Sequence, residues 1–228
     1  MFAGRVDKVA CGTWPTALPD GIDGLHTGNP VRAAVLDQAG HPYPPSDGPI
    51  HGVACGGRQG ARVISETVPE AMARLPDSLH ERLVVSHQAR PEDAERVRAQ
   101  YERAKIAADI QPFFDDMPTR MAAAHLVICR SGASSVADLS DIGRPSILIP
   151  LAAALRDEQS ANARGLVDAA AAVLIPESKL DPASLSEQMM LILTTPDVGK
   201  RMSANALTQG NPHAARALAD LVDRLAGE

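Results

Sequence analysis

Short apolar segments alternate with longer segments of helical periodicity along most of the chain. The segments that predict buried strands are 50–55, 82–86, 105–111, 125–128, 146–150 and 171–175. Those that predict helices are 61–75, 91–103, a segment beginning near 118, 136–142, 158–169, 181–193, 196–208 and 212–225. Buried strands that alternate with helices are typical of a parallel sheet covered on both faces. The pattern therefore predicts an α/β fold with a doubly wound, Rossmann-like parallel sheet.

Two turns of small residues follow predicted strands and precede predicted helices. One is Gly-Gly-Arg-Gln-Gly-Ala at 56–61, and the other is Ser-Gly-Ala-Ser-Ser at 131–135. Unpaired N–H groups and the helix dipole favour a phosphate at such a helix start, and small side chains let it approach. Neither turn is a GxGxxG motif or a P-loop, so an ordinary βα turn capped by serine is the alternative.

Acidic and histidine side chains supply the remaining candidate chemistry. Asp115 and Asp116 precede a predicted helix near Pro118, where capping is favoured over metal binding or acid–base work because no third ligand is in view. His87 follows a predicted strand and is expected to line a cleft. Three other histidines are base candidates by residue type alone, and a lone histidine is more often structural: His51, His80 and His125.

Composition narrows the function classes. The 228 residues carry a net charge of −6 with a pI of about 5.6, which gives no nucleic-acid footprint. The cysteines lack zinc-ligand spacing, so we expect reduced thiols in a cytosolic compartment and neither a metal nor a cofactor. No apolar run approaches the ~18 residues of a membrane-spanning helix, and the N-terminus lacks a signal-peptide core. Residues 1–28 are rich in turns and too short to bury a core.

Several motifs occur together in one order. They are Gly-Asn-Pro-Val-Arg at 28–32, the turn at 56–61, Phe-Phe-Asp-Asp-Met at 113–117, Arg-Ser-Gly-Ala at 130–133, and Glu158-Gln159 followed by Asn162-Ala163. Together they resemble the C-terminal half of the MurG family of peptidoglycan N-acetylglucosaminyltransferases. That family has the GT-B architecture, in which two Rossmann-like domains face a cleft. The resemblance implies a remnant of the N-terminal acceptor domain at 1–30, a linker at 31–48 and a UDP-sugar-binding domain at 49–228.

The resemblance also implies roles for individual residues. Main-chain groups near Phe114 and the side chain of Met117 match the uracil pocket. The diphosphate would lie against Ala133, Ser134, Ser135 and Arg58, and the other nucleotide and sugar contacts would come from Arg32, Asp138 and Gln159. Three positions depart from the family: Asp138 stands where glutamate is usual, Arg58 where serine is usual, and Ala153 where histidine is usual.

The implied reaction is inverting transfer of N-acetylglucosamine from UDP-N-acetylglucosamine to the lipid-linked muramoyl-pentapeptide, which converts lipid I to lipid II in peptidoglycan synthesis. The acceptor would be bound through the N-terminal domain at the cytoplasmic face of the bacterial inner membrane, with peripheral membrane contact. No catalytic base is identified, so we expect the isolated chain to bind donor without transferring sugar. A non-catalytic UDP-sugar-binding domain, a subunit of a two-chain enzyme and a sugar-nucleotide epimerase of the same architecture remain alternatives.

Overall fold

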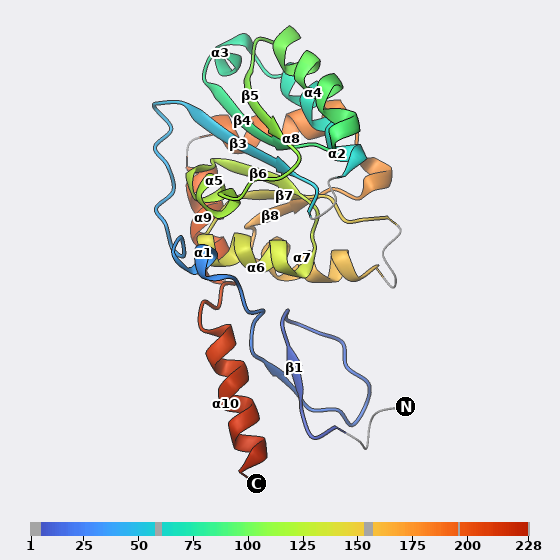
Figure 1. The fold of residues 1–228 in the computed structure, drawn as a ribbon, viewed down its shortest axis with the longest axis vertical. Helices are drawn as coiled ribbons and strands as arrows, with labels where there is room; N and C mark the ends of the chain where they lie inside the picture. Colours follow the sequence, from blue (N-terminus) through green and yellow to red (C-terminus); the bar gives the residue numbers. More distant parts are fainter. Residues whose placement is uncertain (1–5, 58–60, 153–156, 196, 228) are drawn as a thin grey trace.

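A computed structural model describes residues 6–57, 61–152, 157–195 and 197–227. A six-stranded sheet lies at its centre, with every strand parallel to its neighbours, in the order β5-β4-β3-β6-β7-β8 (Figure 1). The strands are β3 (Ile50–Cys55), β4 (Leu83–Gln88), β5 (Ala107–Gln111), β6 (Leu126–Cys129), β7 (Ser146–Leu148) and β8 (Ala172–Leu174). The predicted doubly wound parallel sheet is therefore confirmed.

Helices cover both faces of the sheet and enclose two apolar cores. One core includes residues from α2 (Arg62–Ala73), α4 (Pro91–Arg103) and α8 (Pro182–Thr194). The other includes residues from α5 (Met117–Ala123), α6 (Ala133–Ile142) and α7 (Glu158–Asp168). The remaining helices are α1 (Ala33–Leu36), α3 (Asp77–His80), α9 (Val198–Leu207), α10 (Ala214–Ala226) and the 3-10 turn Glu177–Lys179.

The end of β4 differs from the prediction. The strand continues to Gln88, so His87 lies within the sheet and is fully buried, with its Nδ1 2.9 Å from the hydroxyl of Tyr101. Burial, with help from the charge of Arg96, lowers the pKa of His87 to about 3. The expectation that His87 lines a cleft is wrong, because the strand is longer than its apolar run.

The segment 31–48, which the resemblance implies is a linker, contains closely packed residues. Val35 in α1 is fully buried, and α1 packs against α5 and α6. Arg144, whose side chain is also fully buried, donates to the carbonyl oxygens of His41 and Pro42 and to those of Met121 and Ala122 at the end of α5. Burial lowers the pKa of this arginine to about 10. The guanidinium therefore joins residues 41–42 to the end of α5 through hydrogen bonds.

The N-terminal segment forms a two-stranded parallel sheet of β1 (Val9–Cys11) and β2 (Gly24–His26). This sheet and α10 extend together from one side of the molecule (Figure 1). Asn211, just before α10, donates from Nδ2 to the carbonyl oxygen of Thr27 at 2.8 Å. Gly28 has a φ of +76°, and a Cβ there would lie 2.9 Å from the Cβ of Asn211. The chain thus needs a glycine where the two segments meet.

Candidate functional site

A cleft of about 540 Å³ opens at the carboxyl ends of the central strands, where ligands bind in folds of this kind. We call it the strand-end cleft. The turn after β3, the turn after β6 and the loop after β7 contribute its walls. Its described lining residues are Gly56, Gly57, Ala61, Arg62, Val63, Arg90, Arg130, Gly132, Ser134, Ser135, Leu151, Gln159 and Glu177. Three arginines against one glutamate make this lining cationic, which suits an anionic ligand.

The start of α6 forms one wall of the cleft. Gly132 is the extended N-cap residue and provides no side-chain cap, and the first helical hydrogen bond runs from the N–H of Val136 to its carbonyl oxygen. The N–H groups of the three preceding residues therefore have no acceptor within the helix. Ser134 and Ser135 line the cleft, whereas Ala133 borders a separate hollow on the other side of the same turn. This is the geometry that accepts a phosphate.

Arg130 and Glu177 brace the loop that follows β7. The guanidinium of Arg130, which is 9% exposed, donates to the carbonyl oxygens of Ile149 and Pro150 and to Glu177 Oε2 at 3.1 Å. Glu177 Oε2 also accepts from the N–H of Ala152 at 3.0 Å. Burial raises the pKa of Glu177, but the hydrogen bonds from Arg130 and Ala152 outweigh it and lower that pKa overall. Arg130 and Glu177 therefore pair with each other and both hold the loop after β7 through hydrogen bonds to its backbone.

Gln159 is oriented by the same loop. Its Oε1 accepts the N–H of Leu151 at 3.0 Å. The carbonyl end of the side chain is thus occupied, and the NH₂ group remains as a donor for a ligand in the cleft. A sugar hydroxyl is an acceptor of the right kind.

Arg32 and Asp138 approach one another outside the described lining of the cleft. Arg32 Nη2 lies 3.9 Å from Asp138 Oδ2, with the arginine side chain largely exposed and the aspartate side chain 15% exposed. Burial raises the pKa of Asp138 to about 6, and the charge of Arg32 partly opposes this shift. Asp138 lies one helical turn after Ser134, so a ligand on the first turn of α6 could reach it.

The loop between β5 and α5 is organised by an arginine that the motif comparison did not single out. The guanidinium of Arg120 lies 4.3 Å from the ring centroid of Phe114, whose side chain is only 3% exposed. Arg120 Nε donates to Asp116 Oδ1 at 2.8 Å, and Nη1 lies 2.8 Å from Asp109 Oδ2. Asp116 is the N-cap residue of α5 but makes no side-chain cap hydrogen bond. The predicted capping role of the Asp116 carboxylate is therefore wrong, and the pairing with Arg120 replaces it.

The sequence-predicted residues are only partly gathered in one place. Ser134, Ser135 and Gln159 line the strand-end cleft. Phe114 and Met117 lie at the β5–α5 junction, with Met117 half-buried against the second core. Arg58 and Ala153 lie outside the described residues. The cleft residues that motif reasoning gave no role are Arg62, Arg90, Arg130 and Glu177.

The histidine candidates serve the fold. His51 donates its backbone N–H to Nδ1 of His125 at 3.1 Å, and the two rings stack at 6.3 Å. His80 lies 3.0 Å from the carbonyl oxygen of Met72. Among the described lining residues of the strand-end cleft, none is a histidine. Over the described ranges, no helix is long and apolar enough to cross a membrane, and no group of three or more His, Cys, Asp or Glu side chains is placed to hold a metal ion.

A parallel sheet with a cationic cleft and an uncapped helix start at its strand ends defines a Rossmann-like domain of the phosphate-binding class. The family model of the glycosyltransferase family 28 C-terminal domain matches residues 53–222. The chain therefore belongs to that glycosyltransferase family, and its fold is that of the C-terminal half of a GT-B protein.

Curated relatives cover nearly the whole chain. It is 46% identical over 232 residues to a protein of Sinorhizobium fredii, covering 99% of this chain and 61% of the relative. It is 51% identical over 201 residues to a protein of Methylobacterium nodulans, covering 87% of this chain and 54% of the relative. Both carry the name UDP-N-acetylglucosamine–N-acetylmuramyl-(pentapeptide) pyrophosphoryl-undecaprenol N-acetylglucosamine transferase. The chain thus spans less than two thirds of the length of either relative.

Solved structures agree on the fold. The crystal structure of MurG from Acinetobacter baumannii matches with a TM-score of 0.78 and 29% identity, covering 97% of this chain and 62% of that chain. A putative UDP-N-acetylglucosamine 2-epimerase from Listeria monocytogenes matches with a TM-score of 0.63 at 17% identity, covering 92% of this chain and 56% of that chain. The second likeness shows the fold alone.

Proposed function

We propose that this chain supplies the donor site of a transferase that moves N-acetylglucosamine from UDP-N-acetylglucosamine to a lipid-linked muramoyl-pentapeptide in peptidoglycan synthesis. The observation that carries the proposal is the convergence of Ser134, Ser135 and Gln159 in one cationic cleft at the strand ends. The names of the relatives support the identity of the donor and acceptor.

The strand-end cleft and the positions beside it have separate roles in this proposal. The diphosphate lies against the N–H groups that open α6, with the arginine-rich wall facing it. The NH₂ group of Gln159 donates to a sugar hydroxyl, and Asp138 accepts from the ribose. Main-chain groups of the Phe114 loop hydrogen-bond the uracil edge.

The chemistry follows from this placement. The acceptor hydroxyl attacks the anomeric carbon while the bond from that carbon to the β-phosphate oxygen breaks, and UDP leaves with the electron pair. Fixed N–H dipoles and arginines stabilise the charge that develops on UDP. A general base must take the hydroxyl proton. The relatives are longer than this chain, and we assign the general base to the part of their length that the chain does not cover. We assign binding of the lipid-linked acceptor to the same part. Peripheral contact with the cytoplasmic face of the inner membrane is assigned there too.

Calorimetry tests the donor site directly. Titrations of the chain with UDP, UDP-N-acetylglucosamine and ADP should show binding of both uridine nucleotides and much weaker binding of ADP. Equal affinity for ADP and UDP would overturn the assignment of the uracil loop. Undetectable binding of all three would overturn the donor site itself.

A further inference from the structure

Two cysteines face each other across the two central strands of the sheet. β3 and β6 are parallel neighbours, and their register pairs Cys55 with Cys129, which is the last residue of each strand (Figure 1). Directly aligned residues of neighbouring strands point to the same face of a sheet. Both cysteines accordingly belong to the core that includes residues from α5, α6 and α7. The two thiols therefore lie side by side in that core.

Both cysteines are free, with Cys55 4% exposed and Cys129 fully buried. The hydrogen bond with Cys55 is the largest cause that raises the pKa of the Cys129 thiol well above its ordinary value, followed by burial and by the charges of Cys55 and Asp138. Cys129 is therefore a poor first nucleophile. A small oxidant should reach and react with the less buried thiol of Cys55 first.

The strand geometry allows a bond between these two sulfur atoms. Neighbouring strands lie about 4.8 Å apart, which falls within the range of about 4.4–6.8 Å between the Cα atoms of a disulfide. The Cβ atoms of a disulfide lie closer together, at about 3.8 Å. A Cys55–Cys129 disulfide would therefore draw the two strand ends together by roughly 1 Å. Cys11 belongs to β1 in the separate two-stranded sheet and is not aligned with either of them.

Such a movement would act directly on the strand-end cleft. Gly56 follows Cys55, Arg130 follows Cys129, and both of these residues line the cleft. Arg130 also holds the loop after β7 through the carbonyl oxygens of Ile149 and Pro150. A crosslink between the strand ends would therefore move two walls of the cleft toward each other.

We propose that Cys55 and Cys129 form a reversible disulfide in the presence of hydrogen peroxide, and that this crosslink narrows the strand-end cleft and weakens UDP binding. The effect on UDP rests on the proposed function, whereas formation of the disulfide does not. A disulfide at this position would make the donor site sensitive to oxidants.

The reaction has two steps. The thiolate sulfur of Cys55 attacks one oxygen of the peroxide, the O–O bond breaks, and the departing hydroxide takes up a proton to become water, which leaves a sulfenic acid. The sulfur of Cys129 then attacks the sulfenic sulfur, the S–O bond breaks, and a second water leaves as the S–S bond forms. Two thiols are thus oxidised by two electrons in total, and one hydrogen peroxide is reduced to two waters.

Peptide mapping tests the disulfide in the full chain. The reduced chain is treated with hydrogen peroxide, the excess is removed, and the remaining thiols are alkylated under denaturing conditions. Mass spectrometry should then find the peptides of Cys55 and Cys129 joined by a bond that dithiothreitol cleaves, with Cys11 alkylated in the same sample. Absence of the joined peptides, or a bond from either cysteine to Cys11 instead, would overturn the proposal.

Matched variants test the effect on UDP. After peroxide treatment, the unmodified chain and Cys11→Ala should bind UDP about tenfold more weakly, as expected for one lost hydrogen bond to a charged group, and dithiothreitol should restore the affinity. Cys55→Ala retains every methionine and should bind UDP equally before and after treatment. An equal loss in Cys55→Ala, or unchanged affinity in the crosslinked chain, would overturn the effect on the cleft. A reduced chain that binds no UDP would contradict only the proposed donor site, since the joined peptides decide the disulfide by themselves.

Discussion

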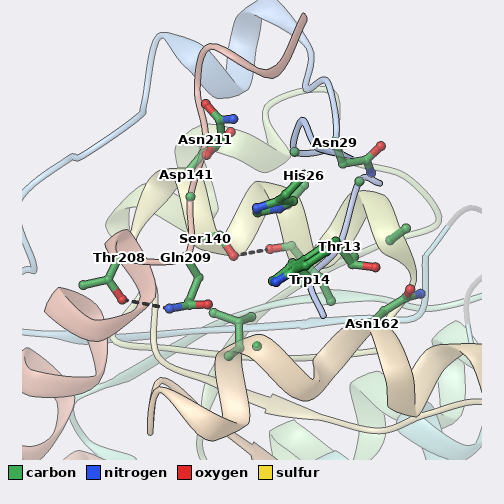
Figure 2. A pocket seen from close by; sticks show the side chains of 18 residues that line it. Thr13, Trp14, His26, Asn29, Ser140, Asp141, Asn162, Thr208, Gln209 and Asn211 are labelled. Atoms are coloured by element: carbon green, nitrogen blue, oxygen red, sulfur yellow. Dashed lines mark hydrogen bonds between the residues drawn. The ribbon is translucent and has the colours of Figure 1, made fainter. Parts of the chain in front are cut away.

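Two hollows flank the first turn of α6, and they differ in charge although they share a helix. The strand-end cleft has Arg62, Arg90 and Arg130 around the serine side of the turn. The separate hollow, of about 400 Å³, has the amides Asn29, Asn162 and Gln209 and the indole of Trp14 around the alanine side (Figure 2). Hydrogen-bond donors at a helix start are thus not enough to define a ligand. The side chains contributed by distant segments set the charge of each hollow.

The difference also reflects how each hollow is built. The strand-end cleft is formed by turns that directly follow strands of one sheet, so the sheet register fixes its walls. The hollow beside Trp14 is formed where the N-terminal segment meets the segment before α10, and the hydrogen bond between Asn211 and Thr27 is one of the contacts that join them. Donor binding should therefore respond to changes at the strand ends.

The largest expected effect comes from Ser134→Glu. A carboxylate at the start of α6 would occupy the place of the diphosphate and repel it, and unpaired charge in a partly desolvated site costs several kcal/mol, or about 100-fold or more in UDP affinity. Stability should change little, because an acidic residue suits a helix N-terminus. Calorimetry with UDP and thermal unfolding measure the two quantities.

Ser134→Gln is the matched control, since it adds similar bulk without charge. It should lose less UDP affinity than Ser134→Glu. Unchanged UDP affinity in a folded Ser134→Glu variant would indicate that the phosphate binds at the Gly56–Gly57 turn instead.

Arg120→Met should have the next largest effect. It removes the cation stacked on Phe114 and the ion pair with Asp116. The loop that we assign to uracil binding therefore loses two stabilising contacts. We expect about tenfold weaker UDP binding, from a cation–π contact of ~1 kcal/mol and a partly exposed ion pair. Affinity for inorganic pyrophosphate, measured by competition, should not change.

Arg98→Met provides the control for Arg120, because Arg98 pairs with Glu95 on an exposed helix face. It should bind UDP normally. Equal losses of affinity for UDP and for pyrophosphate in Arg120→Met would show that Arg120 supports the whole cleft and not the uracil-binding loop in particular.

A smaller effect is expected from Glu177→Gln, which weakens the contacts of residue 177 with Arg130 and with the loop after β7. Gln159 then becomes less well oriented, so UDP-N-acetylglucosamine should lose about fivefold in affinity, or ~1 kcal/mol, with UDP itself nearly unaffected. Glu187→Gln on the exposed side of α8 is the control. An equal loss for both nucleotides would contradict a role in sugar recognition.

The sheet and the small-residue turn at the start of α6 could be predicted because apolar runs and runs of small residues are local signals. The three-residue strand β2 has no apolar run and was not predicted. Contacts between residues far apart in the sequence could not be predicted either, because they have no local signal. The hydrogen bond between Arg130 and Glu177 joins residues 47 positions apart, and the one between Asn211 and Thr27 joins residues 184 positions apart. Arg120 lies four residues after Asp116, a spacing that could have indicated their pairing.

The smallest expected effect is a pH dependence that should belong to the strand-end cleft alone. Burial raises the pKa of Asp138 to about 6, so this carboxylate is mostly ionised at pH 7 and mostly protonated at pH 5. Only the ionised form pairs with Arg32 and accepts both ribose hydroxyls. UDP affinity should therefore fall as the pH is lowered from 7 to 5, by about threefold, because the contact with the carboxylate contributes less than ~1 kcal/mol. Asp138→Asn should remove this slope, leaving only the slope from ionisation of the UDP phosphate. Parallel calorimetric profiles for the two proteins would contradict a contact between Asp138 and the nucleotide.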